Sequence, residues 1–139
     1  MLKLLRNMST SPNTPAAVST LHEHLTIFVI IRKDLTKSLS WPVGSVIGQA
    51  CHAVSAVLWE NSDDAAVKAY MADIPNMHKV TLQIKNESQL RMISEDMTEK
   101  QLKHHLWIEQ PENIPTALAT ISCKRSEIQE MIKKCSLYP

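Results

Sequence analysis

The sequence has little glycine and few aromatic residues, and each shortage excludes a class of protein. The sequence has only two glycines, Gly44 and Gly48, and they are four positions apart. The nucleotide-binding loops GxxxxGK[ST] and GxGxxG therefore do not occur, because the first needs two glycines five positions apart and the second needs three glycines. The GxSxG and HExxH patterns of many hydrolases and metalloproteases are also missing. Six residues are Phe, Trp or Tyr, which predicts a core built mostly from aliphatic side chains.

Cysteines are also few, and long apolar runs are missing. Cys51, Cys123 and Cys135 are widely spaced and form no CxxC pair, which fits a reducing compartment better than a disulfide framework or a zinc site. The longest apolar run, residues 27–31, is far shorter than the roughly 18 residues that a membrane-spanning helix needs. We therefore expect a cytoplasmic protein with no membrane partner, no metal and no cofactor.

The first 24 residues differ in composition from the rest. Residues 1–21 contain two bases, no acid, and many Ser, Thr and Pro residues. Such a segment cannot bury enough apolar surface to become ordered, so we expect a disordered tail over residues 1–24 and one domain over residues 25–139. The alternative is that residues 1–20 form a mitochondrial targeting segment, because residues 1–6 are basic and could be amphipathic.

The remainder alternates between strand and helix patterns. The element order β-α-α-β-α-β-β-α predicts a three-layer α/β/α fold around a mixed sheet of about four strands. Ser40 is expected to cap the longest helix and Ser126 the last one. The expected strands are residues 25–31, 79–85, 105–109 and 116–122, and the expected helices are residues 43–60, 63–71, 87–100 and one that begins near residue 126.

The longest predicted helix has a polar line beside its apolar, core-facing stripe. The expected stripe consists of Val46, Ile47, Ala50, Ala53, Val54, Val57 and Leu58. Ser45, Gln49 and His52 follow i, i+4, i+7 spacing and share one face. Because the helix follows the first strand, it should begin at the carboxyl edge of the sheet, where open sheets build their sites. The first turn favours an anion such as a phosphate. The alternative is that this polar face of the helix only contacts solvent and that His52 has a structural role rather than acting as a base.

A second polar group follows the third predicted strand. Glu109 could act as a general base or orient water, although loop carboxylates are often only solvated. The pair His104–His105 does not predict a metal site, because neighbouring strand residues point to opposite faces. His22 and His24 lie in the segment expected to be disordered, so we interpret their spacing as chance. Three basic residues near the end of the first strand could bind phosphates beside the helix: Arg32, Lys33 and Lys37.

Two motifs in this sequence resemble those of a known family. Residues 30–35 read IIRKDL and residues 44–53 read GSVIGQACHA. In this order and at this separation they resemble the V-x-R-x-D-L and G-K-x-A-A-Q-x-x-H-A patterns of type 2 peptidyl-tRNA hydrolases. The resemblance covers roughly residues 25–137. The strings SWPVG, QACHA and LWIEQPEN are similar to a eukaryotic branch, the peptidyl-tRNA hydrolase domain-containing proteins.

This resemblance implies a function and a set of site residues. It implies hydrolysis of the ester between a peptide and the terminal ribose of tRNA, and it implies a homodimer, which family members often form. The resemblance places Gln49, His52, Glu109 and Asn113 in the catalytic site with Ser45 at the helix start, and Arg32, Lys33, Asp34 and Thr116 in substrate binding.

The chain also departs from the family pattern. The family's helix lysine falls on Ser45, and its D-A-G-R-T loop falls on residues 109–113, so that Glu109 replaces the aspartate and Asn113 the threonine. Losing a preorganised donor costs on the order of a hundred- to a thousand-fold in rate. The first hypothesis is therefore a hydrolase with weak or altered activity. The alternative is a catalytically inactive module on the same fold that binds tRNA or a protein.

Overall fold

The computed structural model describes residues 23–139. The predicted tail and the alternative targeting segment therefore lie outside the described residues, apart from Glu23 and His24. Among the described residues, no helix is long and apolar enough to span a membrane.

A mixed five-stranded sheet forms the middle layer, with strand order β3-β4-β1-β2-β5. The central pair β1 and β2 is parallel, and the other neighbours are antiparallel. Every residue of β1 is buried, as expected for a central strand covered on both faces. The strands are β1 (Thr26–Arg32), β2 (His78–Ile84), β3 (His104–Glu109), β4 (Ile114–Thr120) and β5 (Ser136–Leu137).

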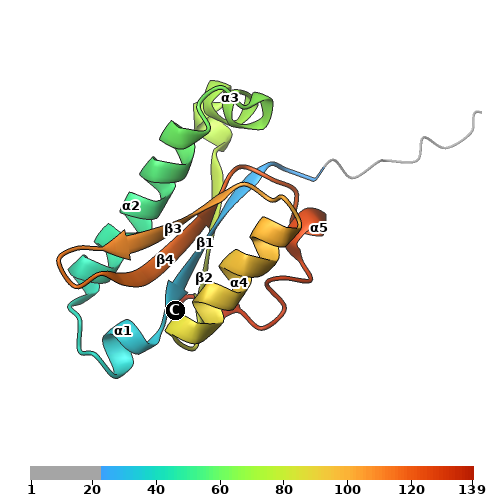
Figure 1. Cartoon of the computed structure of the whole chain (residues 1–139). Helices are drawn as coiled ribbons and strands as arrows, with labels where there is room; N and C mark the ends of the chain where they lie inside the picture. The colour runs from blue at the N-terminus through green and yellow to red at the C-terminus, as the bar shows by residue number, and fades with distance from the viewer. Residues whose placement is uncertain (1–22) are drawn as a thin grey trace, which may run out of the picture.

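Helices cover both faces of this sheet, which confirms the predicted three-layer α/β/α fold (Figure 1). Helix α2 lies over one face and α4 over the other, and each face has its own apolar cluster. Residues of β1 alternate between the two clusters, with Val29 packed under α2 and Ile30 under α4. The helices are α1 (Asp34–Lys37), α2 (Val43–Glu60), α3 (Ala65–Ala72), the 3₁₀ helix η1 (Ile74–Asn76), α4 (Glu87–Glu99) and α5 (Arg125–Ile128).

The sheet and the helix ends differ from expectation in several details. The sheet has five strands rather than about four, because the chain end adds the two-residue β5 beside β2. Ser40 does not cap α2, which has Pro42 at its N-cap, and Ser126 does not cap α5, which has Lys124 there. Helix α1 occupies a segment expected to be a loop. These differences arise at short elements and at helix ends, where tertiary contacts outweigh local propensity.

Helix α2 has the predicted bounds, but its buried face is rotated from the predicted stripe. Ile47, expected in the core, is 58% exposed, whereas the polar Gln49 is buried. The buried positions are Val46, Gln49, Ala53 and Val57.

The three cysteines are free thiols in different surroundings. Burial raises the pKa of Cys123 to about 11, and it does the same for Cys135. Both thiols therefore stay protonated at neutral pH, while Cys51 is exposed on α2.

Candidate active site

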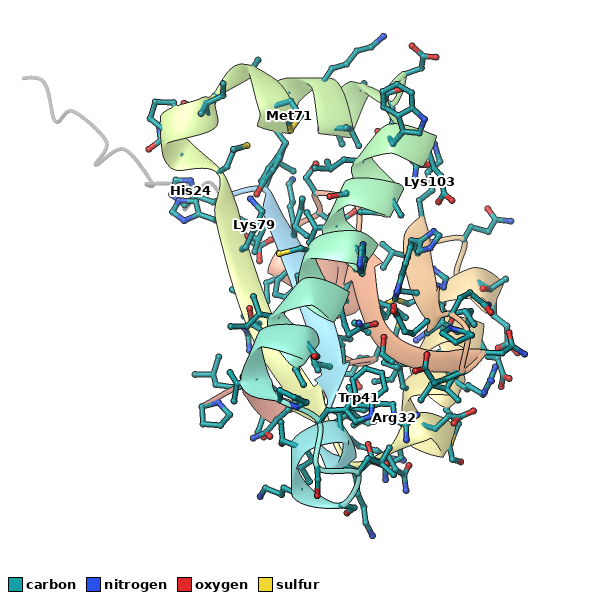
Figure 2. All side chains as sticks on the ribbon, turned by 90° about the vertical axis from the view of Figure 1, so that its left-hand side faces the viewer. His24, Arg32, Trp41, Met71, Lys79 and Lys103 are labelled. Carbon is teal, nitrogen blue, oxygen red and sulfur yellow. The ribbon has the colours of Figure 1, made fainter. Side chains whose placement is uncertain are left out.

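A polar hollow of about 430 Å³ lies at the start of α2, beside the end of β3. Figure 2 shows Trp41 at this end of the molecule, together with Arg32, and shows Met71 and Lys103 at the opposite end. Because α2 follows β1 and the short helix α1 in the chain, its start and the hollow lie near the carboxyl edge of the parallel strands, where open α/β sheets build their sites. Its lining consists of Ser40, Trp41, Pro42, Ser45, Gly48, Gln49, His52, Glu109 and Glu112.

The predicted polar line on α2 faces this hollow. Ser45, Gln49 and His52 all line it, as their spacing along the helix predicts. Ser45 and His52 are exposed, and their side chains form no hydrogen bond with any other residue in the described part of the chain. These two side chains are thus free to contact a ligand.

Gln49 is held by a hydrogen bond to β4. The hydroxyl of Thr116 donates to Oε1 of Gln49 at 2.7 Å, and both residues are buried. In residues 23–139, every fully buried side-chain nitrogen or oxygen has a hydrogen-bond partner. The Nε2 atom of Gln49 has none, so it is not fully buried, and it is reached from the hollow that Gln49 lines. Thr116 therefore fixes the amide with its N–H₂ group available as a donor.

A β-bulge directs Thr116 toward α2. Trp107 pairs with Ala117, but the next residue of β3 pairs with Pro115, which leaves Thr116 as the extra residue of β4. Regular alternation would place Thr116 on the α4 side, because Ala117 packs under α2 and Leu118 under α4. The bulge interrupts this alternation and turns the hydroxyl to Gln49, as bulges often do beside functional sites.

Trp107 contacts two of the predicted catalytic residues. Its indole N–H donates to Oε2 of Glu109 at 2.7 Å. Its ring stacks on the imidazole of His52, with ring centroids 4.5 Å apart and planes inclined by 13°. Glu109 Oε1 has no hydrogen-bond partner among residues 23–139, and the residue lines the hollow. One carboxylate oxygen is fixed, and the other remains free.

Arg32 and Asp34 form a separate, closed cluster. The Arg32 guanidinium donates twice to the Asp34 carboxylate, at 2.9 and 2.8 Å. Its Nη1 also donates to Glu87 and to the backbone oxygen of Pro115, at 3.2 and 3.0 Å. The Arg32 side chain is only 6% exposed. The structure therefore gives Arg32 and Asp34 protein partners, and neither lines the hollow; their substrate-binding role stays a prediction.

Lysines surround a second hollow, of about 330 Å³, at the ends of β1 and β2. Lys33, Lys37 and Lys85 line it beside Asp34, Ser38 and Asn86. None of these three lysines belongs to an ion pair in the described part of the chain, whereas Lys68 and Lys103 do. The hollow contains two of the three predicted bases, Lys33 and Lys37, and adds Lys85, which follows β2. The third predicted base, Arg32, does not line it.

The comparisons with known proteins agree with the motifs in the sequence. The family model for peptidyl-tRNA hydrolase PTH2 matches residues 25–138. The chain belongs to the peptidyl-tRNA hydrolase PTH2 family. A human protein named "Putative peptidyl-tRNA hydrolase PTRHD1" is 34% identical over 98% of this chain and 93% of its own length. A mouse protein of the same name is 37% identical over 80% of each chain.

A solved structure supports the fold of this PTH2 member. The Agrobacterium protein of unknown function Atu0240 has a TM-score of 0.56 and 15% identity, and the match covers 84% of this chain and 98% of that one. At this identity the likeness shows the fold alone.

Two predictions for this PTH2 member involve residues away from the hollow. Asn113 lies in the β3–β4 turn with a positive φ of 56°, where it accepts a hydrogen bond from Gln110, and it does not line the hollow. His104 bonds Ser94, whereas His105 bonds Glu60, so these two histidines point to opposite faces. No group of three metal-binding side chains occurs among residues 23–139.

Sequence reasoning missed Trp41 and Trp107 in this site. Trp107 lies two residues before Glu109, so strand alternation puts both on one face, and this spacing was the available signal. Trp41 follows Ser40, outside any periodic pattern. No local signal marks its position at the hollow.

Proposed function

We propose that this protein hydrolyses the ester bond between a peptide, or another acyl group, and the terminal ribose of tRNA. Water adds to the ester carbonyl, the ester bond breaks, and the products are the free acid and the 3′-terminal ribose hydroxyl. Family membership supports the substrate class. The observation that carries the proposal is the Gln49 amide, which Thr116 fixes with its N–H₂ available to a hollow that also contains Glu109.

The hollow offers a donor for the oxyanion that develops on the ester carbonyl. Gln49 Nε2 is preorganised because its Oε1 is already bonded, so the enzyme does not have to reorient the amide during the reaction. The N-terminus of the 18-residue helix α2 adds a favourable field for negative charge. Together these features partly replace the cation that the family pattern places at position 45.

Two side chains can activate the water. Glu109 has one oxygen free, and His52 is exposed with no hydrogen-bond partner among the described residues. A general base must lie within hydrogen-bond distance of the water that it deprotonates. We assign this role to Glu109, because its carboxylate is held in place by a hydrogen bond and His52 is held only by stacking.

The lysine hollow would hold the tRNA phosphates. Lys33, Lys37 and Lys85 have no acidic partner in residues 23–139, so their charges are available to a phosphodiester backbone. Residues 38 and 40 belong to one short connection, and they line the lysine hollow and the polar hollow respectively. A backbone bound at the lysines would thus lie close to the place where the ester must bind.

The test is release of peptide from an N-blocked aminoacyl-tRNA by the purified protein. The wild type should release it, and Glu109→Gln should reduce the rate by about a hundred-fold or more, because the amide cannot accept the proton. Ser45→Lys should raise the rate, since it restores the charge near the oxyanion. Trp59→Phe, at an 83% exposed position at the far end of α2, serves as the control with unchanged rate.

The uncharged Ser45 favours a second candidate, a binding module without turnover. A wild type that binds tRNA but releases no peptide at high protein concentration would support it. If tRNA is the partner, affinity should fall steeply with salt concentration, by an amount set by the number of phosphate contacts. Activity gained only in Ser45→Lys would show that the scaffold is intact and that only the charge is missing.

A further inference from the structure

The structure assigns Trp107 as the positioning residue of the site: its indole orients the Glu109 carboxylate toward the hollow and fixes the plane of the His52 ring. This inference rests on the proposed function, in which Glu109 activates the water. It adds a residue that neither the spacing on α2 nor the family pattern singles out.

The first step of the argument is the hydrogen bond from Trp107 to Glu109. An indole N–H is a donor only, and a half-buried indole needs an acceptor. The bond at 2.7 Å reaches a carboxylate, and such charge-assisted bonds are about twice as strong as neutral ones. Because Oε2 is engaged, rotation of the carboxylate is restricted. Oε1 is left as the acceptor for water in the hollow.

The second step is the packing of the indole itself. Trp107 packs at the edge of the apolar cluster under α2, so the core restrains its ring. The same ring stacks on His52, which lies on α2, while Glu109 lies on β3. Trp107 thus connects two polar residues from two elements with one rigid side chain, and rigid supports are what preorganise a site.

The third step is the strand geometry that delivers Trp107 to this place. Trp107 and Glu109 are two residues apart on β3, and the bulge between Trp107 and Ile108 lies between them. The same bulge turns Thr116 to Gln49. Regular alternation along β3 therefore puts Trp107 and Glu109 on the face that α2 covers, and the extra residue of β4 brings Thr116 to the same face.

Nuclear magnetic resonance of the indole N–H groups tests the pairing without any assay of activity. The chain has three tryptophans, so three indole signals are expected, and Trp41→Phe and Trp59→Phe assign them by elimination. The Trp107 signal should lie downfield, because its N–H donates to a carboxylate oxygen at 2.7 Å. In Glu109→Gln it should move upfield, because a neutral amide oxygen is a weaker acceptor than a carboxylate. If the chemical shift of the Trp107 indole N–H is the same in Glu109→Gln as in the wild type, the proposal is overturned.

Kinetics test the role of the pairing. Trp107→Phe keeps a ring that can stack on His52 but removes the N–H, so kcat should fall roughly ten- to a hundred-fold, with KM changed less than about twofold, because misplacement near 1 Å can cost about a hundred-fold in rate. In the Glu109→Gln background the same substitution should cost nothing further, since Trp107 acts through Glu109. Trp59→Phe is the matched control and should leave both constants unchanged.

A Trp107→Phe variant with the wild-type kcat overturns the proposal, and so does an equal loss in the Glu109→Gln background, which would indicate a general packing defect. An inactive wild type would instead overturn the proposed function. The indole signal alone then decides whether Trp107 positions Glu109. That measurement uses the Trp41, Trp59 and Glu109 variants, so it does not depend on Trp107→Phe folding.

Discussion

Two polar groups meet at the start of β4, and they differ in how completely the protein satisfies them. In the Arg32 cluster, the guanidinium makes four hydrogen bonds to Asp34, Glu87 and Pro115 and is almost fully buried. In the polar hollow one residue further along β4, Thr116 bonds Gln49, whose amide nitrogen remains free. The first group uses four of the five guanidinium N–H donors on protein acceptors and is almost closed to solvent. The second is held on one side and open on the other.

The difference teaches how a small fold divides its polar residues between structure and recognition. Charged groups are buried only when they are paired and hydrogen-bonded, so the Arg32 cluster stabilises the junction of β1, β4 and α4. The hollow keeps free donors and acceptors because the lining side chains remain accessible. Substitutions in the two groups should therefore affect different quantities.

The largest effect on stability is expected from the closed cluster. Arg32→Ala should lower the free energy of unfolding by about 3 kcal/mol, because it leaves the Asp34 carboxylate and the Pro115 oxygen without their donor. Urea denaturation followed by circular dichroism measures it. Arg91→Ala is the matched control: Arg91 also pairs with Glu87 but is exposed, so it should cost only about 0.3–0.5 kcal/mol. An equal loss of unfolding free energy in Arg32→Ala and Arg91→Ala would contradict the distinction between the buried cluster and exposed ion pairs.

Thr116→Val should give an intermediate effect on both stability and rate. Valine keeps the shape but removes the hydroxyl, so the buried Oε1 of Gln49 loses its donor, at a cost of about 1–3 kcal/mol. The amide is then free to rotate, and the rate of peptide release should fall as well. Thr116→Ser, which keeps the hydroxyl, should retain most of the rate. A Thr116→Val variant with full activity would show that the amide orientation does not matter.

Gly48→Ala should give the smallest effect. Unlike the two substitutions above, it should stabilise the protein. Apart from the neighbouring backbone of α2 itself, no atom lies within 4 Å of the added Cβ. The gain in helix propensity should therefore raise the free energy of unfolding by about 0.5–1 kcal/mol. Because Gly48 lines the hollow, its methyl group should also raise KM. Gly44→Ala, in the same helix and equally unobstructed but outside the lining, should leave KM unchanged. A KM that rises in both variants would argue against the hollow as the site.

Much of the fold could be predicted from the sequence because its signals are local. The continuous apolar run before Arg32 predicts a strand buried on both faces, and that strand is β1. The bounds of α2 match the periodic segment at residues 43–60. The i, i+4, i+7 spacing also placed Ser45, Gln49 and His52 on one face, and all three line the hollow. Periodicity is a property of consecutive residues, so the sequence contains it directly.

The sequence by itself determined the order of the longer elements, the family and the polar line on α2. Only the tertiary structure decided which polar groups are buried and paired with other protein groups, and which remain accessible to a ligand. Arg32 and Lys33 are neighbours in the sequence, yet one is paired and buried and the other lines a hollow. The bond from Thr116 to Gln49 joins residues 67 positions apart, through a bulge with no local signal in the sequence. Such pairings depend on how strands register and helices pack, which no short stretch of sequence specifies.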